Sequence, residues 1–262
     1  MTQIWSTGLT SVIAMSALVV IPTHQEALNI GKVLETLRDT HSNIDVLVVD
    51  DASTDGTGDI ARSFDSPEFK VQVIERPTKN GLGNAYRFGF QYALDHGYDV
   101  VAEMDADLSH DPRVLPELVA IADMGIDLAI GSRYVPGGRI EGWPKGRLRL
   151  SRWGNRYVAL LLGLAINDAT AGFRAFTTRT VKENALTTTK SDGYTFQIET
   201  TYRLVRNGAR IVEVPIVFRE RTAGVSKMSK AIVREALMNV TRWGLKDIVT
   251  GRRKPVYESS NP

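Results

Sequence analysis

The sequence contains no cysteine among its 262 residues. Disulfide frameworks, thiolate metal sites and a cysteine nucleophile are therefore excluded. It also lacks a strong charge of either sign, because 32 basic and 30 acidic residues leave a formal net charge of +2. A nearly neutral chain has no overall attraction for the phosphate backbone of a nucleic acid, so we expect no nucleic-acid partner.

Long hydrophobic runs are absent as well. The two longest apolar stretches, over 12–21 and 157–166, have ten residues each, and Ser16 interrupts the first. A helix needs about 20 residues to cross a bilayer. No basic residue precedes Lys32, so the positively charged start of a secretory signal is missing. We expect a cytoplasmic protein that does not cross a membrane by itself.

The nearly balanced charge hides an uneven distribution along the chain. Residues 45–111 contain 14 acidic and five basic side chains, whereas residues 131–156 contain seven basic and one acidic. Ten basic and four acidic side chains follow from Arg219 to the end. Such a division suits a protein that holds cations in one place and anions in another. Two solvated faces of opposite charge would give the same count, and composition does not choose between them.

Hydrophobic patterning predicts an α/β fold. Short apolar runs that stop at turn or acidic residues are typical of buried parallel strands. Amphipathic stretches between them predict helices, and one of these places Ile30, Val33, Leu34 and Leu37 at helical spacing. Alternating strands and helices place ligands at the carboxyl ends of the strands. The predicted strands cover 17–21, 45–49, 70–74, 99–104, 127–130, 172–177 and 210–218, and the later helices cover 82–96, 114–124, 151–163, 196–207 and 228–250.

The strongest chemical signal is Asp105-Ala106-Asp107 at the end of a predicted strand. Residues i and i+2 of an extended backbone project to the same side, so the two carboxylates converge. A hard divalent cation such as Mg²⁺ or Mn²⁺, bridging to a diphosphate, would neutralise their repulsion. A polar strand end that caps the helix near Pro112 is the alternative interpretation.

Three other segments carry weaker signals. In VVDDASTDGT, Asp50 could accept hydrogen bonds from a nucleobase, of which guanine offers two adjacent donors; a helix cap is the alternative. In PTHQE, a carboxylate could meet a ribose or a base, but the same residues suit a turn and a helix start. The segment 79–84, KNGLGN, is similar to a phosphate-binding glycine loop but lacks the full G-x-G-x-x-G spacing. The alternative is that its glycines only begin a helix.

Taken in order, PTHQE, VVDDASTDGT and EMDADLSH resemble the family 2 nucleotide-sugar glycosyltransferases. The later segments GSRYVPGG, WPKGRLRLS, DATAGFRAF and EVPIVFRERTAGVSK are similar to one branch, the polyprenol-phosphate (dolichol-phosphate) mannose synthases of the soluble bacterial type. The resemblance covers about residues 17–245. It implies a GT-A, Rossmann-like nucleotide-diphospho-sugar transferase fold, with a mostly parallel sheet, flanking helices and a C-terminal amphipathic helix.

The resemblance also implies an activity: inverting transfer of mannose from GDP-mannose to polyprenyl phosphate, with Mg²⁺ or Mn²⁺, to give a lipid-linked mannose donor. A polyprenyl-phosphate glucosyltransferase that uses UDP-glucose and a non-catalytic nucleotide-binding regulatory domain are the alternatives. Independent chemistry agrees, because a lipid phosphate is largely dianionic at neutral pH and is already a nucleophile. Such an enzyme mainly needs cations that offset the repulsion between two anionic substrates.

By the same resemblance, the domain covers 17–250, with a nucleotide-binding half (17–131) and an acceptor and membrane-facing half (132–250). A disordered or linker lead-in (1–16) and a flexible tail (251–262) flank it.

The implied nucleoside contacts are Pro22, His24, Glu26, Val48 and Asp50, and Lys79 joins them as a substrate-binding residue. Metal and diphosphate would bind Asp105, Ala106 and Asp107, the metal ligands being Asp105 and Asp107, with Asp107 and Arg133 as the catalytic pair. Arg133 would lie at the sugar-phosphate end, Arg147 near the acceptor phosphate, and Arg221 and Lys227 on the donor phosphates.

The final helix, 228–250, mixes apolar residues with basic ones and precedes a basic tail. This pattern suits a helix that lies on an anionic membrane surface. Packing against the core with the basic residues in solvent is the alternative. We expect peripheral association with the cytoplasmic face of the membrane, either directly or through an integral-membrane partner protein or domain.

Overall fold

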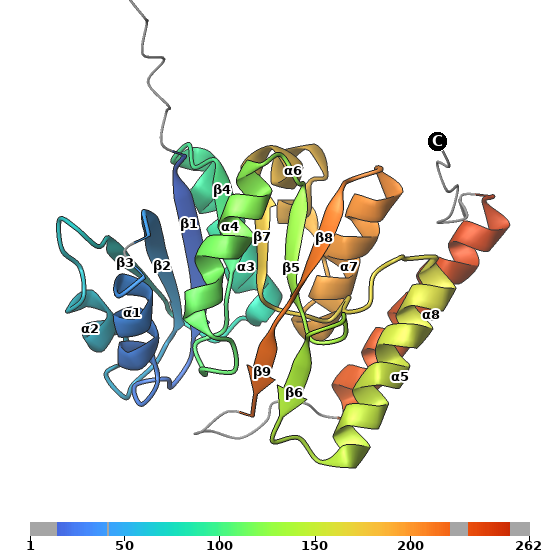
Figure 1. The fold of residues 1–262 in the computed structure, drawn as a ribbon, viewed down its shortest axis with the longest axis horizontal. Coiled ribbons are helices and arrows are strands. Elements are labelled where there is room, and N and C mark those ends of the chain that lie inside the picture. The colour runs from blue at the N-terminus through green and yellow to red at the C-terminus, as the bar shows by residue number, and fades with distance from the viewer. Residues whose placement is uncertain (1–14, 41, 221–229, 252–262) are drawn as a thin grey trace, which may run out of the picture.

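The computed structural model describes residues 15–40, 42–220 and 230–251. Its centre is a sheet of seven strands, in which β7 runs antiparallel to both of its neighbours and every other pairing is parallel. The spatial order is β3-β2-β1-β4-β7-β5-β8 (Figure 1). The strands are β1 (Ala17–Thr23), β2 (Ile44–Asp51), β3 (Val71–Arg76), β4 (Val100–Glu103), β5 (Leu128–Ser132), β7 (Arg174–Thr177) and β8 (Ile211–Pro215). The predicted fold class, with its mostly parallel sheet, is confirmed.

The central strands are apolar on both faces because helices cover both. In β1, Val19 and Ile21 belong to one hydrophobic cluster, whereas Leu18 and Val20 belong to the other. All four side chains are at most 2% exposed. A strand that is buried on both sides cannot alternate apolar with polar residues, and this explains the continuous apolar run in the sequence.

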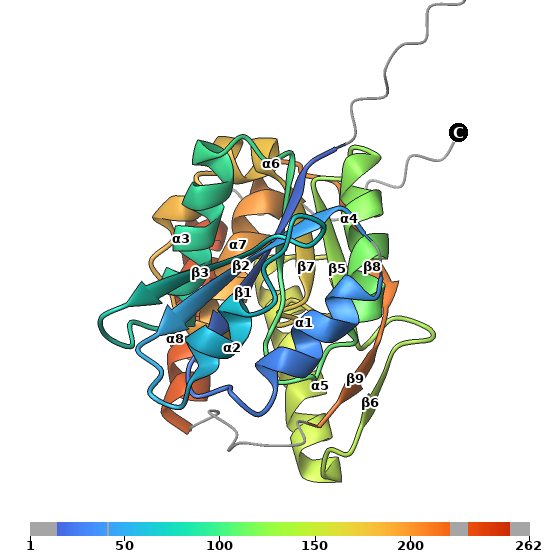
Figure 2. The same ribbon diagram turned by 90° about the vertical axis from the view of Figure 1, so that its left-hand side faces the viewer.

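Two layers of helices enclose the sheet (Figure 2). One face carries α1 (Ile30–Arg38), α2 (Thr57–Arg62) and α4 (Leu115–Asp123), and the other carries α3 (Leu82–Asp95), α6 (Thr178–Glu183) and α7 (Gly193–Arg206). The long helices α5 (Lys145–Leu162) and α8 (Lys230–Val249) contact each other, and α8 also contacts α7. Two short 3₁₀ helices are η1 (Pro112–Val114) and η2 (Leu186–Thr188).

The predicted strand over 210–218 is divided in two. Its first part, β8, pairs with β5, which ends at Ser132 opposite Pro215. Beyond that point the main sheet offers no further partner, and the chain continues as β9 (Val217–Arg219), parallel to β6 (Arg139–Glu141). This small ribbon lies at the lower edge in Figure 1, where β1, β2 and β4 also end. The division therefore carries the chain toward the edge where ligands are expected.

The predicted helix over 151–163 starts six residues earlier, at Lys145. The Gly- and Arg-rich segment before Ser151 looked like a loop, but arginine and leucine favour helices and Pro144 is well suited to precede one. The short elements α2, α6 and β6 were not predicted. Among the described helices, none is long and apolar enough to cross a membrane.

Helix α3 packs closely on β1, and this contact depends on Gly89. A Cβ atom at this position would lie 2.5 Å from both γ carbons of Val20. We expect Gly89→Ala to lower the free energy of unfolding by about 1–3 kcal/mol through overpacking. Gly154→Ala is the control, because its new Cβ would meet nothing within 4 Å. It should raise the free energy of unfolding by up to about 1 kcal/mol, because alanine favours a helix more than glycine does. Urea denaturation measures both, and equal effects would contradict the packing argument.

Candidate active site

Three segments with predicted site residues come together at the carboxyl edge of the sheet. Thr23 in β1 pairs with Asp50 in β2, and Val20 pairs with Glu103 in β4. Residues 48–51 form the end of β2, residues 22–26 span the end of β1 and the loop after it, and residues 105–107 follow β4. The sheet therefore brings the three segments to one edge, as expected.

The loops at this edge have strained backbones. Gln25, Ala52 and Leu108 have φ values of 60°, 54° and 60°, and they follow β1, β2 and β4. A residue with a side chain pays of order 1–3 kcal/mol for such a sparsely populated conformation, and these residues cluster at functional sites. The strain indicates that the loops are held in definite shapes by their surroundings.

Asp50 ties two of these loops together. Its Oδ1 accepts hydrogen bonds from Thr23 Oγ1 and Ser53 Oγ, each at 2.6 Å, and its Oδ2 accepts one from the Ser53 amide at 2.9 Å. The side chain is buried. It does not cap the next helix, whose N-cap is Gly56. A carboxylate has about four acceptor positions, so one remains for a ligand such as a nucleobase.

The other predicted nucleoside contacts differ in exposure. His24 Nδ1 lies 2.8 Å from the carbonyl oxygen of Asp51, and Glu26 Oε2 accepts a hydrogen bond from Asn29 at 2.9 Å. Pro22 lies near the end of β1 and is half-buried. Val48, in contrast, is fully buried in the core cluster. Val48 as a whole, its backbone included, is 0% exposed, so its contact with a nucleoside stays a prediction.

The glycine-containing segment 79–84 starts helix α3. The carboxylate of Asp192, which precedes α7, accepts a hydrogen bond from the Gly83 amide. A Cβ atom at Gly81 would lie 2.0 Å from an oxygen of Asp192. The glycines thus make room for a carboxylate at the position where a phosphate would sit on a helix N-terminus. The helix-start interpretation is favoured; Lys79 beside it is exposed, and its substrate contact stays a prediction.

The acidic pair follows β4, which ends at Glu103, and the backbone bends from Ala106 onward. The pair therefore lies beyond the extended strand from which its geometry was predicted. Ala106 packs into the core, and Asp107 Oδ1 accepts a hydrogen bond from the Ser109 amide at 3.0 Å. Asp105 Oδ1 accepts one from the buried Tyr86 hydroxyl at 3.4 Å. Neighbouring charges add to burial in raising the pKa of Tyr86 well above its ordinary value, so this hydroxyl remains a donor.

The donor set fits a hard divalent cation, because both side chains offer only carboxylate oxygens. In the parts of the chain that the structure describes, no group of three or more His, Cys, Asp or Glu side chains is placed to hold a metal ion. Gly172 lies beside Asp105, where a Cβ atom would be in van der Waals contact with the carboxylate, 3.6 Å from Oδ2. Asp105 and Asp107 are thus two candidate ligands, and further oxygen ligands for a metal would have to come from a substrate or from water.

A buried polar cluster near the pair was not predicted. Glu103 is fully buried, and burial raises its pKa to about 7 despite the nearby charge of Arg174. Gln197 of α7 donates a hydrogen bond to Glu103 at 2.8 Å. Arg174 is also fully buried and donates to the carbonyl oxygens of Ala169, Ala171 and Gln197. These contacts attach α7 to the base of the acidic site.

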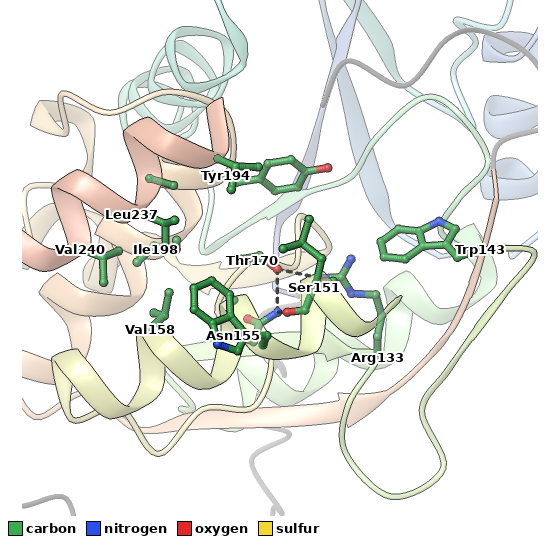
Figure 3. Close-up of a pocket in the computed structure, with 15 residues that line it drawn as sticks. Arg133, Trp143, Ser151, Asn155, Val158, Thr170, Tyr194, Ile198, Leu237 and Val240 are labelled. Carbon is green, nitrogen blue, oxygen red and sulfur yellow. Dashed lines mark hydrogen bonds between the residues drawn. The ribbon is translucent and has the colours of Figure 1, made fainter. Parts of the chain in front are cut away.

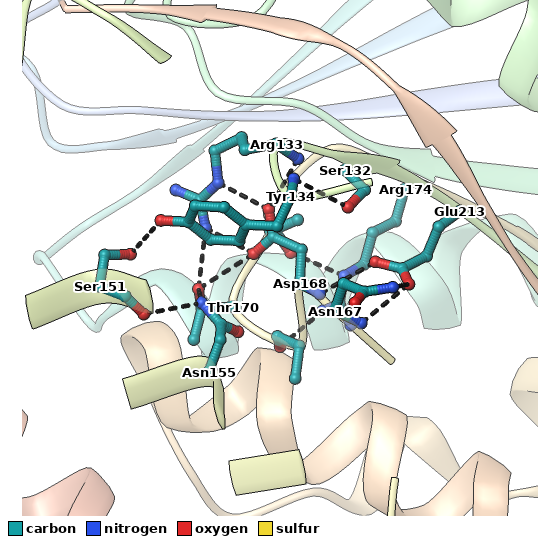
Figure 4. Close-up of polar contacts among 12 residues, drawn as sticks. Ser132, Arg133, Tyr134, Ser151, Asn155, Asn167, Asp168, Thr170, Arg174 and Glu213 are labelled. Carbon is teal, nitrogen blue, oxygen red and sulfur yellow. Dashed lines mark hydrogen bonds and ion pairs between the residues drawn. The ribbon is translucent and has the colours of Figure 1, made fainter. Parts of the chain in front are cut away.

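Arg133, which follows β5, is held by a buried carboxylate (Figure 4). Its amide, Nε and Nη2 donate to Asp168 at 3.0, 2.7 and 2.6 Å. Burial alone would raise the pKa of Asp168, but the charge and hydrogen bonds of Arg133 lower it below its ordinary value. Asp168 lies in the DATAGFRAF segment, but no role was predicted for it. The pair leaves Arg133 oriented but largely neutralised.

A further layer of hydrogen bonds surrounds this pair. Arg133 Nη2 also donates to Thr170 at 2.8 Å, and Asn155 of α5 donates to the same hydroxyl at 3.1 Å. On the other side, Glu213 of β8 accepts from the amide of Asp168 at 2.9 Å. The network therefore joins β5, β8 and α5, as Figure 4 shows.

Next to Arg133 lies an apolar pocket of about 100 Å³ between α5, α7 and α8 (Figure 3). Arg133 and Trp143 lie on one side of it, and Val158, Ile198 and Val240 lie on the opposite side. Further lining residues include Leu150, Ser151, Trp153, Asn155, Thr170, Tyr194, Val233 and Leu237. An oriented guanidinium at the rim of an apolar pocket suits a ligand with an anionic head and a hydrocarbon tail.

Arg147, at the start of α5, stacks on the same tryptophan. Its guanidinium carbon lies 3.9 Å from the ring centroid of Trp143, and that of Arg133 lies 5.7 Å from it. Arg147 Nη1 donates to both carboxylate oxygens of Glu220, each at 2.9 Å. The structure thus brings the two predicted arginines to one indole ring. Arg221 and Lys227, which were predicted to contact the donor phosphates, lie outside the described residues.

Comparison with known proteins identifies the family. The sequence pattern described as "Glycosyl transferase family 2" matches residues 18–184. The chain belongs to this family. The predicted family is thereby confirmed, as is the expectation of an enzyme, a glycosyltransferase, over a non-catalytic regulatory domain.

Curated members of the family are similar over most of the chain. An undecaprenyl-phosphate mannosyltransferase from Micrococcus luteus is 50% identical over 88% of this chain and 95% of its own length. A polyprenol monophosphomannose synthase from Mycolicibacterium smegmatis is 46% identical over 87% of each. A dolichol-phosphate mannosyltransferase from Pyrococcus furiosus is 33% identical over 87% of this chain and 63% of its own.

Solved structures with the same fold are more distant. A glucosyl-3-phosphoglycerate synthase from Mycobacterium tuberculosis, in complex with Mn²⁺, UDP-glucose and phosphoglyceric acid, has a TM-score of 0.65 at 20% identity, over 88% of this chain and 80% of that one. Mannosyl-3-phosphoglycerate synthase from Rubrobacter xylanophilus has a TM-score of 0.65 at 16% identity, over 95% and 79%. In this glycosyltransferase fold, divalent metals occur together with nucleotide sugars.

The buried pair of Arg133 and Asp168 should dominate the acid sensitivity of this family 2 domain. We expect Asp168→Asn to lower the free energy of unfolding at neutral pH by about 3–5 kcal/mol, because it leaves a buried guanidinium unpaired. Because the pKa of Asp168 is lowered in the folded state, its stabilisation is present above the unfolded value of about 3.9 and is lost as the pH falls further. The two proteins should therefore converge in stability at acid pH.

Urea denaturation at several pH values between neutral and acid measures this difference. Glu35→Gln is a suitable control, because Glu35 pairs with Lys32 on the exposed surface of α1, and it should leave stability unchanged. If the two proteins differ little in free energy of unfolding at neutral pH, or if the difference grows on acidification, the stabilising role of the Arg133–Asp168 pair is refuted.

Proposed function

We propose that this glycosyltransferase moves mannose from GDP-mannose to a polyprenyl phosphate, inverting the anomeric carbon and forming polyprenyl-phosphate-mannose. One observation carries the proposal: an oxygen-only acidic pair follows β4, while Arg133 and Arg147 share one indole ring beside an apolar pocket. The first site suits a metal-bound diphosphate, and the second suits an anionic lipid. The names of the relatives, three of them mannosyltransferases or synthases of polyprenyl or dolichol phosphates, support it.

The proposed mannosyl transfer mainly requires that the protein place positive charges beside its two anionic substrates. The acceptor phosphate is already nucleophilic, so no strong general base is required. Asp105 and Asp107 would hold Mg²⁺ or Mn²⁺, which when bound offsets the charge of the diphosphate leaving group. Asp50 and the loop of His24 and Glu26 face the nucleoside. Direct attack of the lipid phosphate on the anomeric carbon inverts its configuration.

At the acceptor end, the two arginines have different roles. Arg133 is fixed by Asp168 and contributes oriented N–H groups, while its net charge is already neutralised. Arg147 is half-buried, so its guanidinium can donate hydrogen bonds to a phosphate. The apolar wall formed by Val158, Ile198 and Val240 then receives the first prenyl units.

The outer surface of α5 and α8 supports peripheral membrane association. Helix α8 packs on the protein through the buried residues Val240 and Asp247. Other residues of α8 expose apolar and basic side chains. The helix thus packs against the core, and its contact with a membrane is what we propose. The exposed apolar side chains are Leu150, Trp153 and Leu160 of α5 and Met238, Leu245, Ile248 and Val249 of α8; exposed basic residues are Arg149, Arg152, Arg156, Arg234, Arg242 and Lys246. We propose docking on the cytoplasmic face of the membrane, directly or beside an integral-membrane partner.

Turnover of purified protein with GDP-mannose, Mg²⁺ and a short polyprenyl phosphate tests the function. We expect a mannolipid product, and a loss of at least about 100-fold in kcat in Asp107→Asn, because one of the two proposed ligands loses the negative charge that holds the metal. Asp95→Asn, an exposed carboxylate on α3, is the control and should retain full activity. Absence of product with solubilised acceptor would refute the proposal, and unchanged metal-dependent turnover in Asp107→Asn would refute the metal role.

Donor identity is tested separately by product inhibition. GDP should inhibit mannosyl transfer more strongly than UDP if the donor is GDP-mannose. Stronger inhibition by UDP, together with glucosyl transfer from UDP-glucose, would instead favour the polyprenyl-phosphate glucosyltransferase.

The membrane surface predicts a second measurable effect. Leu160 and Leu245 are 72% and 54% exposed, and we expect the double variant Leu160→Glu, Leu245→Glu to bind anionic lipid vesicles at least about tenfold more weakly. Met124→Glu changes an equally apolar, 82% exposed residue that follows α4, and it should bind like the wild type. Vesicle sedimentation measures binding, and equal losses in both variants would argue against a surface on α5 and α8.

A further inference from the structure

Glu220 contacts the arginine that the proposed function assigns to the acceptor phosphate. Both of its carboxylate oxygens accept from a single nitrogen of Arg147, Nη1, at 2.9 Å. A forked arginine–carboxylate pair normally uses two nitrogens. Here Nε of Arg147 is buried and has no hydrogen-bond partner among the described residues. The contact is therefore an incomplete version of the interaction that guanidinium groups make with carboxylates and phosphates.

The backbone places Glu220 at this position. Its amide donates to the carbonyl oxygen of Glu141 at 3.0 Å, directly after the ribbon of β6 and β9. Gly142, with a φ of 87°, lies so close that a Cβ atom there would be 2.9 Å from the Cβ of Glu220. The ribbon thus fixes the start of the glutamate side chain next to Arg147, which lies flat on Trp143.

The pair is also accessible to an incoming anion. The side chains of Arg147 and Glu220 are 17% and 32% exposed. By contrast, those of Arg133 and Asp168 are 5% and 0% exposed. Ion pairs that stay in contact with water are weak, since solvent screens them. A phosphate can replace Glu220 on Arg147, but it cannot replace Asp168 on Arg133.

We propose that Glu220 is an internal competitor for the acceptor phosphate on Arg147. This inference rests on the proposed function. Before the acceptor binds, the carboxylate satisfies Arg147; a lipid phosphate, which carries nearly two negative charges at neutral pH, then displaces it. When the product leaves, the carboxylate returns. Glu220 therefore weakens the binding of acceptor and product alike, and it lets the lipid product leave Arg147 without exposing an unpaired cation.

The opposite role would be positioning, in which Glu220 holds Arg147 in place for the phosphate. Two features argue against it. Arg147 is already held by stacking on Trp143, and Glu220 leaves the buried Nε unsatisfied. The two roles give opposite signs when the carboxylate is removed, because loss of a competitor tightens acceptor binding and loss of a positioning residue weakens it.

Binding of a short polyprenyl phosphate without any sugar donor decides between them. Tryptophan fluorescence or calorimetry gives the dissociation constant, and circular dichroism checks that each variant is folded. We expect Glu220→Gln to bind about fivefold more tightly than wild type, the size of a solvent-exposed ion pair. The matched control is Glu141→Gln, which removes an equal charge from the neighbouring strand, where Glu141 contacts Arg139 and Arg219 instead. It should bind within twofold of wild type.

Each outcome is decisive. Unchanged or weaker binding by Glu220→Gln, or equal tightening in both variants, overturns the competitor role while leaving the proposed function intact. If wild type itself does not bind the polyprenyl phosphate, the proposed acceptor fails, and the inference fails with it. In turnover, Glu220→Gln should also show a KM for the acceptor that is lower by the same factor.

Discussion

The cost of burying charge is the constraint on which this site depends. A charged group removed from water must be paired or hydrogen-bonded, and the edge of the sheet contains several such groups. Asp50 is satisfied by two loops, Arg174 by backbone carbonyls, and Arg133 by Asp168. Each pairing also joins two elements of the fold. The same interactions that make burial tolerable therefore fix the loops in which ligands are expected to bind.

The degree of pairing divides the arginines by function. Asp168 is completely buried and binds Arg133 through three hydrogen bonds. The orientation of the Arg133 guanidinium is therefore fixed, and its positive charge is largely neutralised. Glu220 remains in contact with water and binds Arg147 through one nitrogen. A ligand can compete with the second pair alone. In the proposed acceptor site, the first arginine would therefore set the geometry of binding and the second its affinity.

The fold was predictable from the sequence because its signals are local. The apolar run of β1 and the spacing of Ile30, Val33, Leu34 and Leu37 each occupy one short window, and the structure confirms both. The site was predictable only where residues follow a strand. Carboxylates at the end of β2 and after β4 lie at one edge of the sheet, since both strands run parallel to β1, which lies between them.

The partners of the site residues could not be predicted in this way. Asp168 is 35 positions from Arg133, Gln197 is 94 from Glu103, and Glu220 is 73 from Arg147. Asp192 lies 109 positions from Gly83, and its carboxylate occupies the helix start that looked like a phosphate loop. No spacing rule links such pairs. They come together only in the folded chain, through the antiparallel insertion of β7, the packing of α5 and α7, and the ribbon of β6 and β9. A polar residue in a helix pattern gives no sign of which distant charge it neutralises.

Helices α5 and α8 link the acceptor end to the outer surface. Tyr202 and Arg206 of α7 both contact the buried Asp247 of α8, and the Tyr157 hydroxyl of α5 lies 2.6 Å from that of Thr241. Gly244 of α8 approaches Leu161 of α5 so closely that a Cβ atom would lie 2.6 Å from its Cγ. These contacts make the two helices one unit. Since that unit lines the apolar pocket on its inner side and exposes Leu160 and Leu245 on its outer side, a displacement of either helix changes pocket and surface together. A lipid that partitions into a bilayer would then meet the pocket at the same helices that we propose to contact the bilayer, without a separate element to carry it there.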